Sequence, residues 1–272
     1  MCRLFAYVSP GTSTTERELG DAGIETFLSL ARLHGDGWGW SGIPRPGDAP
    51  ALHKSPLSAA ADPGFRATIA TPGHAAMLHL RWATLGLPVE LRNAHPFRVG
   101  DTSFEHNGSL KPIERVRAML SPDAAARMTG DTDSEMYFTL ILEEQAAGSS
   151  LPEATVRVAR RLREAFPLAS LNAILLDREQ MVVVHASARS ILPDDDIAEI
   201  TQLGGLPDDH NEDYFALRWK HTPDGTVQVS STGVGGDGWE TLPAESVTTV
   251  RLDDRATETV SLAVPAGASV TD

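Results

Sequence analysis

The chain has almost no cysteine: Cys2 is the only one among its 272 residues. A single cysteine excludes an internal disulfide framework and leaves no second thiol for dithiol redox chemistry. No apolar run approaches the roughly 20 residues that a membrane-spanning helix needs. The N-terminus also lacks the basic region and apolar stretch of a secretion signal. We therefore expect a cytoplasmic protein with no membrane partner.

Basic residues are also scarce. Lysine and arginine together number 23 against 37 aspartates and glutamates, and the formal net charge is -14. Such a charge repels phosphate backbones, so we do not expect nucleic acid as a partner. We find no internal repeat and no break in composition, so one domain over residues 1–272 is expected. A homo-oligomer remains an open alternative.

Cys2 directly follows the initiator methionine. Removal of Met1 would place a thiol and a free α-amine on one residue. An α-amine titrates near ~7.7–8.0, so it can accept the thiol proton close to neutral pH. While Met1 is attached, the same nitrogen belongs to an amide and is not basic. The alternative is that Cys2 is simply a small apolar residue of an N-terminal strand.

Hydrophobic patterns predict many strands and a few helices. The expected strands are residues 2–8, 76–84, 171–176, 181–185, 215–219, 226–230, 246–252 and 258–264. The expected helices are residues 22–33, 134–145 and 152–165. Residues 44–73 are rich in proline, glycine and alanine and predict irregular surface structure.

Arg81 comes near the end of the apolar segment 76–84. A guanidinium delivered by a buried strand must meet an anion, because an unpaired buried charge costs several kcal/mol. A structural carboxylate of the protein would satisfy it. The carboxylate of a ligand, held bidentately, would satisfy it equally well.

Two glycine-containing motifs predict close backbone approaches. Residues 34–39, with the sequence HGDGWG, predict a loop that enters a strand where another backbone comes close. Asn107-Gly108 lies between two extended segments and predicts a type I′ hairpin turn. Such a turn can also point a side-chain amide and a backbone N–H in one direction, as a developing oxyanion requires.

Thr132 and Glu135 have the spacing of a capping box and predict the start of a helix. Asp133 would then lie in the first turn, where the helix dipole favours a carboxylate. It could hold a cationic amine or serve as a surface cap. The histidines lack ligand spacings such as H-E-x-x-H, so we expect no metal site and interpret them as packing or polar lining.

Taken together, these motifs resemble the class II glutamine amidotransferases, whose glutaminase domain belongs to the N-terminal nucleophile hydrolases. The short, stand-alone subgroup of YafJ-like and EgtC-like proteins, with their fungal relatives, is the most similar. The motifs occur in the family's order, and the second half of the chain is similar only in its run of strands. They are Cys2, residues 34–39, residues 80–84, residues 93–97, residues 106–108 and residues 132–135.

The resemblance implies a fold and a set of catalytic residues. The implied fold is α+β, a four-layer αββα sandwich of two antiparallel sheets between helical layers. Cys2 corresponds to the nucleophile, and Asn107 and Gly108 to the oxyanion hole.

The resemblance also implies a set of substrate-binding residues. Arg81 corresponds to the residue that grips the substrate's α-carboxylate, and Asp133 to the one that binds its α-ammonium group. Trp82, Thr84 and His95 correspond to positions of the pocket. Several glutaminase domains have histidine after this threonine, whereas this chain has Leu85.

The implied reaction is hydrolysis of the γ-amide of glutamine, or of a related γ-glutamyl compound, through a Cys2 thioester without a cofactor. Three functions remain open. The chain is a glutaminase that passes ammonia to a partner protein, an amidohydrolase acting on another γ-glutamyl amide, or a catalytically silent module that binds a γ-glutamyl ligand or a partner.

Overall fold

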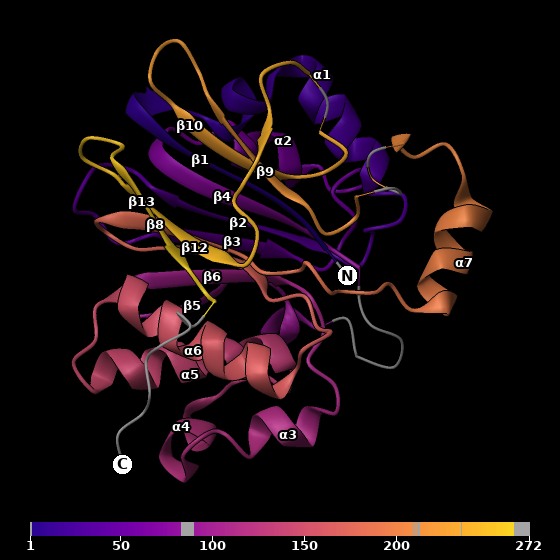
Figure 1. Cartoon of the computed structure of the whole chain (residues 1–272). Coiled ribbons are helices and arrows are strands. Elements are labelled where there is room, and N and C mark those ends of the chain that lie inside the picture. The colour runs from indigo at the N-terminus through magenta and orange to yellow at the C-terminus, as the bar shows by residue number, and fades with distance from the viewer. Residues whose placement is uncertain (1, 83–89, 209, 211–212, 235, 264–272) are drawn as a thin grey trace.

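Two antiparallel sheets are stacked face to face, and helices cover their outer surfaces (Figure 1). The computed structural model describes residues 2–82, 90–208, 210, 213–234 and 236–263. The helices α1 (Thr15–Leu30) and α2 (Gly64–Ile69) lie over one sheet, and α5 (Asp133–Ala146) and α6 (Leu151–Ala165) lie over the other. The α+β sandwich predicted from the resemblance is therefore confirmed.

Seven strands form the first sheet, in the order β11-β9-β10-β1-β4-β2-β3. Their bounds are β1 Cys2–Ser13, β2 Trp38–Ile43, β3 Ala51–Ser55, β4 Gly73–Arg81, β9 Leu217–His221, β10 Val227–Ser231 and β11 Glu240–Thr241. β1 therefore lies in the middle of its sheet, between β4 and β10.

Six strands form the second sheet, in the order β13-β12-β8-β7-β6-β5. Their bounds are β5 Phe97–Val99, β6 Thr102–Asn107, β7 Asn172–Leu176, β8 Gln180–His185, β12 Ser246–Arg251 and β13 Thr257–Ser261. The remaining helices are η1 Leu91–Asn93, α3 Ile113–Arg117, α4 Pro122–Arg127 and α7 Asp194–Leu203.

The alternation of side chains along β1 builds two separate cores. Leu4, Ala6 and Val8 pack between the sheets, together with apolar residues of β4, β7 and β8. Phe5 and Tyr7 point the other way, into the cluster under α1 and α2. Because side chains alternate with a period of two, Cys2 shares the inter-sheet face with Leu4.

Most predicted elements are confirmed, and three predictions are corrected. Residues 44–73 are not wholly irregular, since they contain β3 and α2. The predicted helix 22–33 ends earlier, at Leu30, and a further helical segment precedes it from Thr15, where the Thr14 hydroxyl accepts from the Arg17 N–H. Gly20 interrupts that helix with a positive φ of 66°.

The predicted Asn107-Gly108 hairpin turn is wrong. β6 ends at Asn107 and pairs with β5 and β7, and the chain then continues towards α3. A type I′ turn needs two residues with positive φ, but neither Asn107 nor Gly108 has one. The glycine serves a close backbone approach instead, because a Cβ at position 108 would lie 2.0 Å from the Ser170 carbonyl oxygen.

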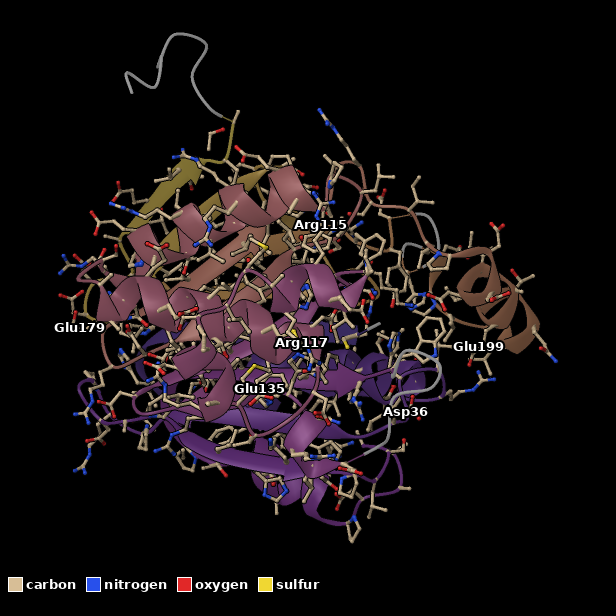
Figure 2. The ribbon with its side chains drawn as sticks, turned by 90° about the horizontal axis from the view of Figure 1, so that it is seen from below. Asp36, Arg115, Arg117, Glu135, Glu179 and Glu199 are labelled. Atoms are coloured by element: carbon tan, nitrogen blue, oxygen red, sulfur yellow. The ribbon has the colours of Figure 1, made fainter. Side chains whose placement is uncertain are left out.

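The start of β1 lies at one of the two ends of the sandwich. Figure 2 shows Asp36 near one end of the molecule and Glu179, in the turn between β7 and β8, at the other. The start of β1 and the end of β4 belong to the Asp36 end, since the Asp36 N–H donates to the Arg81 carbonyl oxygen.

In the part of the chain that the structure describes, no helix is both long and apolar enough to cross a bilayer.

Gly39 provides a test of how closely the two sheets approach. A Cβ at this position would lie 2.2 Å from the His95 carbonyl oxygen and 2.7 Å from Pro96 Cδ. The close approach predicted for residues 34–39 is therefore confirmed. We expect Gly39→Ala to lower the free energy of unfolding by about 1–3 kcal/mol, measured by urea denaturation, because the backbone must move to admit the methyl group.

Gly11→Ala is the matched control, because a Cβ at position 11 meets nothing within 4 Å. Equal losses in the two variants would contradict the argument from close approach.

Candidate active site

Cys2 lies at the start of β1, next to the last residue of β4. The two strands run antiparallel, with Cys2 opposite Arg81 and Leu4 opposite His79. The Arg81 N–H donates to the Gly37 carbonyl oxygen at 2.9 Å, so the HGDGWG loop holds the end of β4. Cys2 and Arg81 are both buried, at 6% and 4% exposure. The pairing of β1 with β4 thus places the Cys2 thiol and the Arg81 guanidinium on neighbouring strands.

Asn107 connects Cys2 to the second sheet. The Cys2 backbone nitrogen donates to Asn107 Oδ1 at 2.9 Å. Asn107 is completely buried, and its Nδ2 finds no hydrogen-bond partner among the described residues. The Ser170 hydroxyl donates to the Asn107 carbonyl oxygen at 2.7 Å and so fixes the end of β6. The amide oxygen of Asn107 therefore holds Cys2, while Nδ2 is available to donate to another acceptor.

Sequence reasoning missed two buried residues on these same strand faces. His79 precedes Arg81 by two positions on β4, and Glu105 precedes Asn107 by two positions on β6. Both are fully buried. The period-two rule applied to Arg81 and Asn107 would have identified them.

His79 and His95 stack on each other beside Cys2. Their ring centroids are 4.3 Å apart with an interplanar angle of 30°. The Cys2 sulfur and one ring nitrogen from each histidine all lie within 4.8 Å of one another. The three residues come from β1, β4 and the loop before β5, so no local sequence spacing could have grouped them.

Burial shifts the pKa values of three groups near Cys2 towards their neutral forms. It lowers the pKa of His79 to about 3, and the positive charge of Arg81 acts in the same direction. Burial also lowers the pKa of His95 well below its ordinary value. It raises the pKa of the Glu105 carboxyl well above its ordinary value, with a further contribution from Cys2. Near neutral pH the two imidazoles are therefore neutral bases.

The loop that carries His95 is fixed by hydrogen bonds on both sides. Lys54 Nζ donates to the Ala94 carbonyl oxygen at 3.0 Å. Asn93 Oδ1 accepts from the Asp131 N–H at 3.1 Å and thereby ties the loop to the segment that leads into α5. Two motifs far apart in sequence are joined at this point.

Asp133 lies in the first turn of α5, as predicted. The Thr132 hydroxyl caps the helix by accepting from the Glu135 N–H. Glu135 does not complete a capping box, because its carboxylate accepts from the N–H groups of Thr129 and Gly130 instead. Asp133 Oδ2 accepts from the Leu110 N–H at 2.6 Å, just beyond Gly108. Asp133 is therefore hydrogen-bonded to the loop that follows Asn107.

The other two pocket predictions have different outcomes. The Trp82 side chain packs in the cluster under the helices, with the His34 ring edge-on at 5.6 Å. Thr84 and the neighbouring Leu85 lie outside the described residues. The roles of Trp82 and Thr84 remain predictions.

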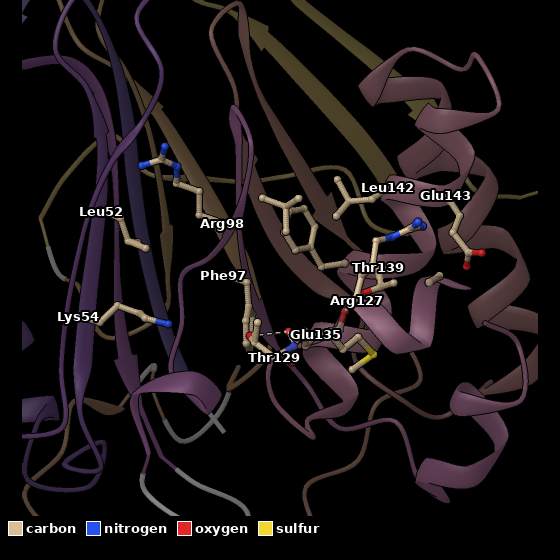
Figure 3. A pocket seen from close by; sticks show the side chains of 14 residues that line it. Leu52, Lys54, Phe97, Arg98, Arg127, Thr129, Glu135, Thr139, Leu142 and Glu143 are labelled. Carbon is tan, nitrogen blue, oxygen red and sulfur yellow. Dashed lines mark hydrogen bonds between the residues drawn. The ribbon is translucent and has the colours of Figure 1, made fainter. Parts of the chain in front are cut away.

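A separate cavity of about 410 Å³ opens between β3 of one sheet, β5 of the other, and the helices α4 and α5 (Figure 3). Lys54, Phe97 and Glu135 are among its lining residues, and the Thr129 hydroxyl donates to the Glu135 carboxylate there. None of the predicted site residues is part of this lining. The cavity meets the site through Lys54, which bonds the His95 loop, and through Phe97, whose ring lies edge-on to the His95 ring at 4.8 Å.

Comparison with protein families gives an independent match. A family model described as class-II glutamine amidotransferases matches residues 1–196. Among curated proteins, the glutamine–fructose-6-phosphate aminotransferase of Zymomonas mobilis is 36% identical over 100 residues, covering 37% of this chain and 16% of that protein. The Vibrio cholerae protein of the same name is 36% identical over 123 residues, covering 44% and 19%. The match thus spans less than a fifth of these relatives.

Solved structures share the fold. A glutamine aminotransferase class-II domain protein from Silicibacter pomeroyi superposes with a TM-score of 0.62 at 19% identity, covering 97% of this chain and all of that one. Glutamine phosphoribosylpyrophosphate amidotransferase from Bacillus subtilis also gives 0.62, at 15% identity, covering 96% of this chain and 49% of its own. At these identities the likeness concerns the fold alone.

The buried carboxyl of Glu105 predicts a specific pH dependence of stability. A carboxyl whose native pKa is raised stabilises the fold fully below its ordinary value of 4.5 and loses this contribution as pH rises towards the native pKa. Over that window the native protein holds a proton that the unfolded chain has released. We expect the stability of Glu105→Gln, relative to the natural protein, to increase by about 1.4 kcal/mol per pH unit from about pH 5 upward.

Denaturant unfolding at several pH values measures this difference. Glu258→Gln, which removes an exposed carboxyl on β13, reports the general effect of losing one negative charge. A Glu105→Gln difference that stays constant with pH would contradict a neutral Glu105.

Proposed function

This chain belongs to the class-II glutamine amidotransferase family, and on that premise we propose that it hydrolyses the γ-amide of glutamine through a γ-glutamyl thioester on Cys2. The observation that supports this most is the arrangement around Asn107. Its Oδ1 holds the Cys2 nitrogen, and its buried Nδ2 has no other partner among the described residues. Cys2, which carries the nucleophile, and Asn107, which carries the donor, are thus hydrogen-bonded to each other.

In the proposed first step, the Cys2 α-amine takes the thiol proton. Removal of Met1 converts the Cys2 nitrogen from an amide into an amine with a pKa near ~7.7–8.0. Asn107 Oδ1 then orients that amine, so its lone pair can face the sulfur. His79 and His95 are uncharged at neutral pH and sit beside the sulfur without adding a positive charge.

In the second step the thiolate attacks the amide carbon, and negative charge develops on the amide oxygen. Asn107 Nδ2 and the backbone of Gly108 are the proposed donors to this oxyanion. The position next to Asn107 accepts only glycine, because a Cβ would strike the Ser170 carbonyl oxygen and His106 Nε2. The backbone is therefore held close against Ser170, in the segment before β7, which pre-organises the donors before the substrate arrives.

Arg81 and Asp133 are the proposed partners of the substrate's α-carboxylate and α-ammonium groups. Arg81 is the β4 residue opposite Cys2, and Asp133 bonds the loop after Asn107. Both are therefore anchored to the backbone that carries the reacting groups. Fixing the amide carbon near the sulfur in this way can lower the barrier by up to ~7–11 kcal/mol in favourable cases.

The amine then returns the proton to the leaving nitrogen, ammonia departs, and water hydrolyses the thioester to glutamate. We propose that an acceptor on a partner protein takes up the ammonia. We also propose a single type-2 amidotransferase domain, because C-terminal strands complete both sheets: β10 pairs with β1, and β12 pairs with β8. A stand-alone YafJ-like or EgtC-like chain remains the proposed subgroup.

A substrate panel tests the proposed reaction. Protein whose mass confirms loss of Met1 should release ammonia from glutamine, and Cys2→Ala should abolish that release because the chain has no other thiol. Protein that retains Met1 serves as the control and should be inactive, because its Cys2 nitrogen is an amide. Amine release from other γ-glutamyl amides in preference to glutamine would indicate the amidohydrolase instead.

Full activity of the Cys2→Ala protein would overturn both enzymatic functions. Binding of glutamate without turnover by trimmed protein would leave the silent module as the explanation.

Asn107→Asp tests the oxyanion donor. This change keeps an acceptor for the Cys2 nitrogen but replaces the Nδ2 donor with oxygen. We expect kcat to fall by about 10²–10³, the usual effect of losing one such donor. The matched control is Asn172→Asp, since Asn172 faces Asn107 across β6 and β7 and its amide bonds backbone groups.

The control should lose stability, measured by urea denaturation, without a comparable loss of kcat. If Asn107→Asp retained kcat, or if the control lost as much, the proposed donor role would be refuted.

A further inference from the structure

Both nitrogens of the buried His95 imidazole, Nδ1 and Nε2, have no hydrogen-bond partner among the described residues. The neighbouring His79 ring has one polar contact, with the His106 backbone, which acts to raise its pKa. Buried polar groups are nearly always hydrogen-bonded, so a complete imidazole without partners next to Cys2 requires an explanation. Each neutral imidazole offers one lone pair, and the proposed hydrolysis gives neither ring a proton to transfer.

The sulfur and the two rings form the donor set of a soft metal ion. Cys2 Sγ and one nitrogen from each ring lie within 4.8 Å of one another, and all three side chains are buried. Metal–nitrogen bonds of about 2.0–2.1 Å and metal–sulfur bonds of about 2.3 Å place such donors roughly 3.5–4 Å apart in a trigonal site. To close this set around an ion, the donors must approach by about 1 Å. The stacked rings must also turn so that both lone pairs converge on the ion.

The charge around the site favours a monovalent ion. Cu⁺ bound to one thiolate and two neutral imidazoles carries no net charge. Zn²⁺ in the same ligands would leave a positive charge in a buried position, next to the guanidinium of Arg81 opposite Cys2. Thiolate is a soft ligand that suits Cu⁺, and imidazole suits copper as well as zinc.

We propose that Cys2, His79 and His95 form a buried, three-coordinate Cu⁺ site. Binding replaces the thiol proton: the sulfur–hydrogen bond breaks, the sulfur–copper bond forms, and the proton leaves to solvent. No electron is transferred. The ligand set needs only side chains, so the site forms whether or not Met1 has been removed.

Occupancy of this site would block the sulfur. Glutamine hydrolysis would then fall in proportion to the bound Cu⁺ and return when a chelator removes it. This consequence alone rests on the proposed function, whereas binding of the ion does not.

The test is an anaerobic titration of the full chain with Cu⁺ in competition with a coloured Cu⁺ chelator. We expect one ion per chain, and an affinity at least about 10-fold lower in Cys2→Ser, His79→Asn and His95→Asn. His53→Asn, which removes an exposed histidine on β3, is the matched control and should bind like the natural protein. A parallel titration with Zn²⁺ should show weaker binding.

Alkylation of the natural protein provides a second measurement that needs no variant. Cys2 is the only thiol, so Cu⁺ should slow its alkylation, and a chelator should restore the rate. Circular dichroism confirms that each variant is folded. Four results would each overturn the proposal. They are the absence of 1:1 binding, an affinity in the three ligand variants equal to that of the natural protein, an alkylation rate that Cu⁺ does not change, and tighter binding of Zn²⁺ than of Cu⁺.

Discussion

The hydrogen bond from the Cys2 nitrogen to Asn107 Oδ1 is the contact on which the arrangement of the site depends. It joins the first residue of β1 in one sheet to the last residue of β6 in the other. Cys2 is paired with Arg81 of β4, and Asn107 is paired with Asn172 of β7, so each end is held by a neighbouring strand. A short bond between two such ends fixes the position of the thiol far more closely than a loop would.

Several titratable groups near this hydrogen bond are buried, and burial shifts their pKa values. His79, His95 and Glu105 are buried beside Cys2, and burial shifts each pKa towards the neutral form. Arg81 supplies a positive charge at the same place. Under the proposed function, this charge meets the α-carboxylate of the substrate.

The motifs along the first half of the chain are connected by direct contacts. Gly39 packs against the backbone of His95, Asn93 bonds the segment before α5, and Asp133 bonds the loop after Gly108. Each motif therefore has a structural task in addition to any role in binding. The cavity near Lys54 lies just outside this set and touches it through the Ala94 carbonyl oxygen.

The amino-acid sequence by itself determined the strands, the main helices, the position of Cys2 after Met1, and the family, because these follow from local periodicity and from short motifs in a fixed order. The αββα layering came from the resemblance rather than from periodicity. Only the tertiary structure decided that Asn107-Gly108 ends a strand instead of turning a hairpin, and that His79 and His95 lie beside the thiol. These features depend on pairing between strands remote in sequence, which no local pattern encodes.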